Sequence, residues 1–254
     1  MKKKKIAIFI PAYEAVKTLI SAIERIPPEI KKEVKEIYVF DDFSNDNTYY
    51  AGLGYKSVNK IEKLNIYRNV RNLGYGGNQK QGYNYAIKKG YDIVVMLHGD
   101  VQYAPEYIPQ LIRPLVEDKA DAVMGSRMLG KPMKGGMPLW KYMGNKFLTF
   151  IENKVLNLRL SEYHTGFRAY SCRALRDIPF TRCPDGYSFD TDILIQLLIR
   201  KKRIAEIPIP THYGPESHKI SFRKSLSYGV NIMKSLVQYK LHKKGIRKVY
   251  KFDI

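Results

Sequence analysis

Residues 98–102 (HGDVQ) place three side chains that can bind a cation at alternate positions. Asp100 supplies the hard carboxylate that Mg²⁺ or Mn²⁺ requires, and Gln102 supplies a neutral oxygen. His98 shifts the preference toward Mn²⁺, because imidazole suits softer metals than magnesium. A cation held here would bridge two phosphates of a nucleotide diphosphate and neutralise a leaving group. The alternative is a polar turn in which Asp100 caps the next helix.

Two further polar segments have the residue types of a ligand site. In residues 41–48 (DDFSNDNT), the adjacent carboxylates of Asp41 and Asp42 repel each other, which indicates a role toward a ribose, a base edge or a cation. A capped helix start, with Ser44 or Asn45 as the cap, is compatible with that role, and we expect both. Residues 69–78 contain three glycines that permit tight turns, but their spacing matches neither the dinucleotide nor the P-loop fingerprint.

The elements around these segments alternate between strand and helix. The pattern predicts strands at 5–10, 36–40, 64–67, 91–97 and 120–125, and helices at 16–25, 76–89 and 105–116. This alternation predicts an α/β fold, with a Rossmann-like, mostly parallel sheet and helices on both faces. Ligands bind at the carboxyl ends of such strands, so residues 11–14, 41–48 and 98–102 should meet in one site.

The second half of the chain is less regular. It predicts a helix at 139–156, a strand at 166–171, a helix at 189–200, a strand at 204–207 and a long basic amphipathic helix at 221–243. No linker separates independent domains. We therefore expect a main domain over residues 1–225 and a basic C-terminal helix, residues 226–254, that belongs to the same unit.

The composition limits the class of protein. The chain has 44 Lys and Arg against 24 Asp and Glu, a net charge of +20, which attracts nucleic acid, an anionic membrane or phosphorylated substrates. Two cysteines, Cys172 and Cys183, are too few for a disulfide framework and favour a reduced, cytoplasmic protein. No run of residues approaches the roughly 20 apolar positions needed to span a bilayer, so we expect a soluble or peripheral protein.

Six short motifs occur in an order that resembles the family 2 glycosyltransferases with a GT-A fold, especially the branch of the dolichyl-phosphate mannose and glucose synthases. The resemblance covers about residues 5 to 225. The motifs are Pro11-Ala12-Tyr13-Glu14, Asp41-Asp42 with Ser44 and Thr48, Asn72-Leu73-Gly74, His98-x-Asp100-x-Gln102, Gly125-Ser126-Arg127 and Gly166-Phe167-Arg168.

The resemblance implies donor-site roles for particular residues. The family usually has Asp where this chain has His98, which removes one negative charge but leaves a group that can still bind a metal. Asp100 and Gln102, with His98, would hold a divalent Mn²⁺ or Mg²⁺ on the diphosphate. Arg127 and Arg168 would be available to phosphate oxygens. The residues expected at the nucleotide-sugar are Pro11, Ala12, Tyr13, Glu14, Asp42, Asn72, Gly74, Gly99, Asp100 and Arg127.

The reaction of this family inverts the anomeric carbon, and the acceptor decides what else is needed. A hydroxyl acceptor, such as one on a glycan, requires a base. Asp190 is favoured over Asp192 because it follows the aromatic residue at the helix start, although either carboxylate could simply stabilise the helix N-terminus. A polyprenyl phosphate acceptor requires cations instead. The candidates are Arg168, His212, Lys219 and Arg223. His212 and Lys219 belong to residues 211–220, a segment that resembles the mobile loop of those synthases. The alternative is a plain surface loop.

The C-terminal helix carries many cations, and Leu226, Met233, Leu236 and Val237 recur along it at helical spacing, so part of it is expected to pack on the body. The rest would lie on an anionic membrane or in solvent. The first option would place the protein on the inner face of the membrane. A nucleic-acid-binding protein is suggested by the charge alone, and no nucleic-acid partner is expected. A nucleotidyltransferase would need a Gly-rich loop after the first strand, which residues 11–15 lack.

Overall fold

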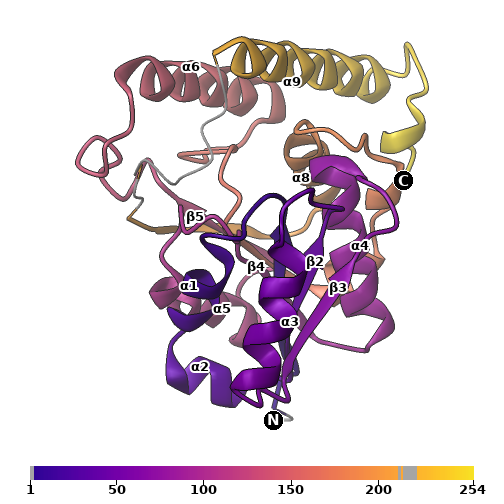
Figure 1. The fold of residues 1–254 in the computed structure, drawn as a ribbon. Helices are drawn as coiled ribbons and strands as arrows, with labels where there is room; N and C mark the ends of the chain where they lie inside the picture. The colour runs from indigo at the N-terminus through magenta and orange to yellow at the C-terminus, as the bar shows by residue number, and fades with distance from the viewer. Residues whose placement is uncertain (1–2, 211–212, 214–221) are drawn as a thin grey trace.

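The computed structural model of this protein describes residues 3–210, 213 and 222–254. Strands and helices alternate along the first half, as expected (Figure 1). The strands are β1 (Ile6–Ala12), β2 (Glu36–Asp41), β3 (Leu64–Arg68), β4 (Ile93–Met96), β5 (Ala122–Ser126), β6 (Arg168–Ser171) and β7 (Ile204–Pro208). The helices are α1 (Leu19–Glu24), α2 (Pro28–Glu33), α3 (Thr48–Val58), α4 (Gly74–Lys88), α5 (Ile108–Val116), α6 (Leu139–Leu156), α7 (Cys172–Arg176), α8 (Phe189–Ile199) and α9 (Phe222–Lys243).

Within the described part of the chain, the strands form one 7-stranded sheet in the order β3-β2-β1-β4-β6-β5-β7. β1 is parallel to both β2 and β4, β2 is parallel to β3, and β5 is parallel to β7. β6 is antiparallel to both β4 and β5. The sheet is therefore mixed but mostly parallel, with helices on both faces, which confirms the predicted fold class.

The alternation of side chains along β1 explains the two layers of helices. Ile6, Ile8 and Ile10 point into a core shared with α1, α2 and α5, whereas Ala7 and Phe9 point into a core shared with α4, α7 and α8. Every residue of β1 from 6 to 10 is buried, as expected for a central parallel strand. β1 continues through Pro11, where the sequence predicted that it ends. Pro11 is compatible with the strand because β4 pairs with β1 only as far as Phe9.

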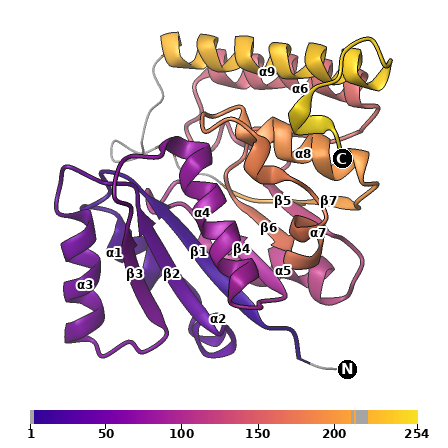
Figure 2. The same cartoon turned by 90° about the vertical axis from the view of Figure 1, so that its right-hand side faces the viewer.

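α6 and α9 form an outer layer over one end of the molecule, and they lie side by side in both views (Figure 2). α9 also packs against α8. Ile232, Leu236 and Tyr239 of α9 belong to the same core as α4 and α8, so α9 and the main domain are one packed unit. The expected boundary between residues 225 and 226 falls inside α9.

The packed face of α9 differs from the one predicted. Leu236 is buried, but Leu226, Met233 and Val237 are exposed. Lys251, one of the C-terminal cations, is also buried. No helix of the described chain is long and apolar enough to cross a bilayer.

Candidate active site

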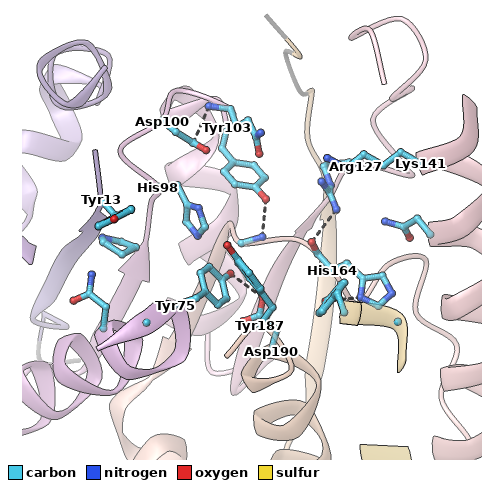
Figure 3. A pocket seen from close by; sticks show the side chains of 18 of the residues that line it. Tyr13, Tyr75, His98, Asp100, Tyr103, Arg127, Lys141, His164, Tyr187 and Asp190 are labelled. Atoms are coloured by element: carbon cyan, nitrogen blue, oxygen red, sulfur yellow. Dashed lines mark hydrogen bonds between the residues drawn. The ribbon is translucent and has the colours of Figure 1, made fainter. Parts of the chain in front are cut away.

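A cavity of about 760 Å³ opens where β1, β2, β4 and β5 end. Figure 3 shows Tyr13, His98 and Asp100 toward one end of this cavity, and Arg127, Lys141 and His164 toward the other. Segments far apart in the sequence therefore meet in one place, as the parallel topology predicts. The predicted site residues that line the cavity are Pro11, Ala12, Tyr13, Asp42, Asn72, Gly74, His98, Gly99, Asp100, Gln102, Arg127 and Asp190.

Other predicted residues are not placed on the cavity wall. Glu14 is exposed, and its backbone has a positive φ of 50°. Arg168 and Asp192 are buried in the core behind the cavity. His212 and Lys219 lie outside the described residues, as does the side chain of Arg223.

The two adjacent carboxylates at the end of β2 have different environments. Asp42 lines the cavity, and its Oδ1 accepts hydrogen bonds from Asn69 Nδ2 and the Leu73 amide, each at 2.8 Å. Asp41 points the other way, where Arg68 lies 3.4 Å from it. Burial raises the pKa of Asp41, although hydrogen bonds from Ser44 and the charge of Arg68 oppose that rise. Asp42 is thus the one of the pair that a ligand can reach.

Ser44 joins the loop after β1 to the loop after β2 and does not cap a helix as predicted. Its hydroxyl donates to Asp41 and accepts a hydrogen bond of 2.9 Å from the Glu14 amide. α3 begins at Thr48, with Asn47 before it. The expected cap at Ser44 or Asn45 was therefore wrong, because the Ser44 hydroxyl is used to join two loops of the site.

Asp100 faces the cavity from the turn after β4. Its Oδ1 accepts a hydrogen bond of 3.2 Å from the Gln102 amide, and Val101 between them has a positive φ of 52°. This conformation is uncommon for a β-branched residue and is associated with functional turns.

His98 is enclosed more tightly than its neighbours. Its ring lies in edge contacts with Tyr75 and Tyr103. A Cβ added to Gly166 would lie 2.4 Å from His98 Nε2, so this nitrogen is directed against the Gly166 backbone. Nε2 is buried without a hydrogen-bond partner in the described structure. Burial lowers the pKa of His98, and the charges of Asp100 and Asp190 oppose that shift.

Arg127 is fixed beneath the other end of the cavity. Its Nε donates to Glu162 at 2.7 Å, its Nη1 to the Tyr213 hydroxyl at 2.9 Å, and its Nη2 to the His164 carbonyl at 2.8 Å. Although burial opposes it, the Arg127 guanidinium lowers the pKa of Glu162. Most Arg127 donors are committed to these partners, so the residue offers a fixed positive charge more than a free fork.

Asp190 sits at the floor of the cavity with both carboxylate oxygens engaged. Oδ2 accepts a hydrogen bond of 2.8 Å from the Tyr75 hydroxyl, and Oδ1 accepts one of 3.2 Å from Gln79 Nε2. Arg168 Nη2 lies 3.5 Å from Oδ2, and its Nη1 donates to the Asp190 carbonyl at 3.1 Å. Arg168 is fully buried, so it positions Asp190 and does not reach a phosphate as the resemblance implied.

Asp192 belongs to a separate buried pair. Lys251 Nζ lies 2.7 Å from its Oδ1 and donates to Ser235 Oγ at 3.1 Å. Burial raises the pKa of Asp192, and the neighbouring Lys251 opposes the rise. We therefore assign Asp192 to attachment of the C-terminus and no longer propose it as a base.

The mouth of the cavity is apolar and comes from the outer helices. Trp140, Phe147 and Leu148 of α6 face Leu226, Val230 and Met233 of α9 across it. Lys141 also lines it, and its Nζ lies over the Tyr213 ring, 4.8 Å from the centroid. Burial and the nearby charge of Arg127 lower the pKa of Lys141 to about 8. None of these residues of α6 was predicted from the sequence to be part of the site.

Comparisons with known proteins decide the family. Residues 7–179 match the family model described as glycosyl transferase family 2. The chain belongs to this family. It is an enzyme, a glycosyltransferase.

Two curated relatives cover most of the chain. A UDP-N-acetylglucosamine–dolichyl-phosphate N-acetylglucosaminyltransferase from Methanococcus voltae is 28% identical over 249 residues, 92% of this chain and 92% of the relative. An undecaprenyl-phosphate mannosyltransferase from Micrococcus luteus is 25% identical, over 81% of this chain and 82% of its own.

Solved structures share the fold. Glucosyl-3-phosphoglycerate synthase from Mycobacterium tuberculosis, solved with Mn²⁺, UDP and phosphoglyceric acid, superposes with a TM-score of 0.72 at 19% identity, over 93% of this chain and 78% of that chain. The same enzyme was solved with Mg²⁺ and UDP. At this identity the likeness establishes the GT-A fold of the glycosyltransferase described here.

The donor set at Asp100 fits a cation that arrives with its nucleotide. The described residues contain no cluster of three or more His, Cys, Asp or Glu side chains that could hold a metal alone. Mg²⁺-like ions are commonly held by one or two carboxylates together with substrate phosphates and water. Asp100 and the neighbouring Gln102 on the cavity wall match that pattern. His98 Nε2 is directed at Gly166, so this nitrogen is not presented to a cation beside Asp100.

Several residues of the site carry no motif that could have identified them. Tyr75 and Tyr187 contribute aromatic rings beside Asp190, with ring centroids 4.9 Å apart. Lys141, Trp140 and Phe147 come from a helix that was predicted with the correct bounds but without a role. The one signal in the sequence for a role of that helix was the recurrence of apolar residues along it at helical spacing.

Proposed function

We propose that this enzyme transfers a sugar from a nucleotide-diphosphate sugar to a polyprenyl phosphate at the surface of an anionic membrane, with inversion at the anomeric carbon. The observation that carries the proposal is an exposed apolar face, formed by α6 and α9, that continues into the mouth of the cavity. We call it the α6/α9 face. The following side chains of it are each more than half exposed: Leu139, Met143, Phe147, Phe150, Leu226, Val230 and Val237.

The spacing of these residues shows that the face is built by two amphipathic stripes. Leu139, Met143, Phe147 and Phe150 follow one side of α6, and Leu226, Val230, Met233 and Val237 follow one side of α9. A monomeric soluble protein rarely exposes apolar residues so densely, and such patches mark a binding surface.

The charges beside this face favour an anionic bilayer as its occupant. The exposed charged residues of α6 and of the described side chains of α9 are cations: Lys146, Lys154, Lys234, Lys240 and Lys243. Glu152, the acidic residue of α6, is buried. Each surface cation near an anionic leaflet contributes about 1 kcal/mol to binding. Because the cytoplasmic leaflet carries most anionic lipid, we infer a peripheral position on the inner face of the membrane.

A lipid acceptor in this position would reach the reaction centre without leaving the bilayer. Its chain would lie against the α6/α9 face, and its phosphate would enter between Trp140 and Val230 toward Lys141 and Arg127. A phosphate oxygen is largely ionised near neutral pH and needs no base. It would attack the anomeric carbon as the bond to the diphosphate breaks. The names of the relatives from Methanococcus voltae and Micrococcus luteus, each a polyprenyl-phosphate sugar transferase, support this acceptor class.

The opposite end of the cavity would hold the donor. Pro11, Tyr13 and Asp42 would surround the nucleoside, and Asp100 with Gln102 would hold Mn²⁺ or Mg²⁺ on the diphosphate. When bound, the cation neutralises the charge that develops on the departing nucleotide. The complexes of the solved structural neighbour with UDP and either metal are consistent with this donor site.

Transfer to a hydroxyl of a glycan is the alternative, with Asp190 as the base. Against it, both oxygens of Asp190 already accept hydrogen bonds, and Arg168 lies 3.5 Å from Oδ2. An acceptor hydroxyl would have to displace one of these partners before it could donate its proton to the carboxylate. The environment of Asp190 is better suited to fixing Tyr75 and contacting sugar hydroxyls.

The acceptor class can be tested by supplying both kinds of acceptor. Purified enzyme with Mn²⁺ would be incubated with UDP- and GDP-sugars and with either undecaprenyl phosphate in phosphatidylglycerol vesicles or soluble oligosaccharides. We expect a lipid-linked monosaccharide from at least one donor. Transfer to oligosaccharide with none to the lipid phosphate would reject the proposal.

A variant of the α6/α9 face tests the membrane contact separately. Phe147→Asp should reduce sedimentation with phosphatidylglycerol vesicles about tenfold, because it places a charge in the apolar face. Val58→Asp is the matched control: Val58 is 80% exposed at the end of α3, away from this face. Equal vesicle binding by both variants would exclude the α6/α9 face as the docking surface.

A further inference from the structure

Three titratable side chains outside the donor site meet where α6, α9 and the segment before β6 converge. His164 Nδ1 lies 2.8 Å from the Tyr228 hydroxyl, and His164 Nε2 lies 3.1 Å from Glu152 Oε2. Glu152 is on α6, Tyr228 is on α9, and His164 precedes β6. We call these three residues the Glu152–His164–Tyr228 relay.

The inner end of the relay is closed to solvent. Glu152 has no exposed side-chain area, and the side chain of His164 is 6% exposed. Thr191 of α8 donates to Glu152 Oε1 at 3.0 Å. In the described structure, His164 Nε2 and Glu152 Oε2 have no linear hydrogen bond, so their contact is chiefly electrostatic. Two lone pairs at this distance would repel each other, so one of the two facing atoms, His164 Nε2 or Glu152 Oε2, carries a proton in this contact.

The outer end of the relay is in the cavity. Tyr228 and His164 both line it, and Leu226, Gly229 and Val230 beside Tyr228 line it too. The ring of Tyr228 meets those of His164 and Tyr187 at near-perpendicular angles. Burial raises the pKa of Tyr228 well above its ordinary value, so the hydroxyl keeps its proton and can donate it in a hydrogen bond.

The backbone around His164 also fixes the two buried arginines. The His164 carbonyl accepts from Arg127, whereas the carbonyls of Tyr163 and Thr165 accept from Arg168 at 2.6 and 2.7 Å. A helix of the α6/α9 face is thus linked through one side chain to the segment that holds both guanidinium groups. A purely apolar contact between α9 and the body would pack this helix equally well, so the polar chain calls for another explanation.

We propose that Tyr228 contacts the acceptor phosphate through its hydroxyl, and that His164 and Glu152 are positioning residues that aim this hydroxyl into the cavity. This inference rests on the proposed function, because it assumes that the acceptor enters between α6 and α9. It adds a neutral donor to the cations Lys141 and Arg127 at that end of the cavity.

The hydrogen bonds of the relay can run in two directions. With Nδ1 unprotonated, the Tyr228 hydroxyl donates to His164 and offers the cavity lone pairs. An anionic oxygen in the cavity favours the reverse order, in which His164 donates to Tyr228 and Tyr228 donates to the ligand. In that order Nδ1 carries a proton, while Nε2 still faces Glu152 Oε2 at 3.1 Å. Asp190 and the guanidinium groups of Arg168 and Arg127 are the other charges that act on Tyr228.

Binding of a soluble acceptor probe tests the proposal. Farnesyl phosphate would be titrated by calorimetry into the full chain loaded with UDP and Mn²⁺. Tyr228→Phe should weaken farnesyl phosphate binding about tenfold or more, the factor for a lost hydrogen bond to a charged group, while UDP affinity stays unchanged. Tyr239→Phe on the same helix is the matched control, because Tyr239 packs against Phe252 in the core and should bind like wild type.

Two substitutions of His164 separate positioning from packing. His164→Asn places an amide near the former Nδ1 and keeps a partner for Tyr228, whereas His164→Gln reaches toward Glu152 instead. We expect the Asn variant to bind farnesyl phosphate at least severalfold more tightly than the Gln variant, although both remove the same ring. Melting temperatures without ligand would confirm that each variant is folded.

The outcomes distinguish the relay from the proposed function. Wild type that fails to bind farnesyl phosphate would contradict the proposed acceptor class itself. Wild-type binding with equal affinity in Tyr228→Phe would overturn the relay alone. Equal binding by the two His164 variants would show that the ring only packs, and would also overturn it.

Discussion

The two ends of the cavity are built in different ways. The end that we propose binds the donor, called the donor end below, consists of short turns directly after β1, β2 and β4. Its geometry therefore follows from a parallel sheet and depends little on distant contacts. The end that we propose binds the acceptor, called the acceptor end below, is assembled from α6, α9 and residues 161–168, which meet only through tertiary packing.

The difference extends to what each end exposes. Asp42 and Asp100 at the donor end present oxygen atoms whose other contacts are backbone amides or a side-chain amide. The acceptor end presents aromatic and aliphatic side chains on helices, with cations beside them. Polar turns fixed at the edge of the sheet suit a nucleotide, because its base, ribose and phosphates present the same groups in every donor. Helix faces, which vary without disturbing the sheet, suit a site that adapts to different acceptors.

The largest expected effect concerns the donor end alone. Asp100→Asn removes the carboxylate that would hold the cation, so turnover should fall on the order of a thousandfold, the upper range for losing one charge-stabilising group. The Mn²⁺-dependent increase in UDP affinity, measured by calorimetry, should disappear. Asp118→Asn is the control, since Asp118 is exposed beyond the opposite end of β5 and pairs with Lys4.

Farnesyl phosphate binding to the Asp100→Asn variant sharpens the comparison. If the two ends are independent, acceptor affinity without nucleotide should match wild type. A variant with undiminished turnover would remove Asp100 from the metal site and with it the division between the two ends.

A second prediction distinguishes a residue that stabilises the core, Asp192, from one that lies at the floor of the cavity, Asp190. Asp192→Asn leaves Lys251 without its charged partner, and the free energy of unfolding should drop by about 3 kcal/mol, as for other broken buried pairs. Denaturant unfolding measures this change. Turnover per folded molecule should stay near wild type, because Asp192 does not line the cavity.

Asp190→Asn is the variant to compare with Asp192→Asn. It should lower turnover as well as stability, since Asp190 faces the cavity and holds Tyr75. Equal losses of turnover in the two variants would contradict the assignment of Asp192 to the C-terminal attachment.

The donor end could be predicted from the sequence, and the acceptor end could not, for a physical reason. Asp42 and Asp100 are placed by strand ends, which hydrophobic periodicity and chain breaks mark directly. Tyr228 and His164 meet where α9 packs beside α6 and the segment before β6, a contact between residues far apart that local pattern does not encode. The motif Gly166-Phe167-Arg168 was noticed, but its arginine donates to backbone carbonyls of the segment just before it and to Asp190.

The prediction of the fold was limited in the same way, because features without a local sequence pattern were not predicted. The bounds of α6 were predicted correctly, yet no helix was predicted at α2, α3 or α7. α2 and α7 have six and five residues, too few to show an amphipathic period. α3 buries Thr48 and Gly52 and no large apolar residue, so it has no apolar period to detect. The antiparallel direction of β6 also had no local signal, since a strand pattern gives no direction.

A third prediction uses pH to examine the acceptor end. Because the pKa of Lys141 is lowered to about 8, its charge should be lost between pH 7 and 9.5. Farnesyl phosphate binding should weaken about tenfold over this range, the value of one charge-assisted hydrogen bond, while the phosphate, with its second pKa of about 6, keeps its charge. Lys141→Gln should show weak binding at both pH values, and a wild-type affinity that does not change with pH would count against Lys141.

The same shift has an opposite consequence for stability. The pKa of Lys141 in the folded chain is below its ordinary value of 10.5, so the unfolded chain binds the proton more firmly. The contribution of this group to the free energy of unfolding should therefore rise between pH 8 and 10.5. Denaturant titrations of wild type and Lys141→Gln at both ends of that window measure it.

The smallest effect is expected where the two ends meet, at His98 and Gly166. His98→Asp restores the residue usual in the family, so turnover should stay within about threefold of wild type, with Mg²⁺ favoured more strongly over Mn²⁺ because a carboxylate is the harder ligand. Complete loss of turnover would mean that the imidazole has a role that its packing does not reveal.

A double-mutant cycle with Gly166→Ala tests the packing directly. In the wild-type background, a Cβ at this position would lie 2.4 Å from His98 Nε2, so the free energy of unfolding should fall by about 1–3 kcal/mol, as for other overpacked cores. In the His98→Asp background, the shorter side chain vacates that space, and most of the loss should vanish. Additive losses would show that the imidazole does not press on Gly166. His98 Nε2 would then be free to turn toward the cation beside Asp100, and the donor end would hold two metal-binding side chains from the turn after β4 in addition to Gln102.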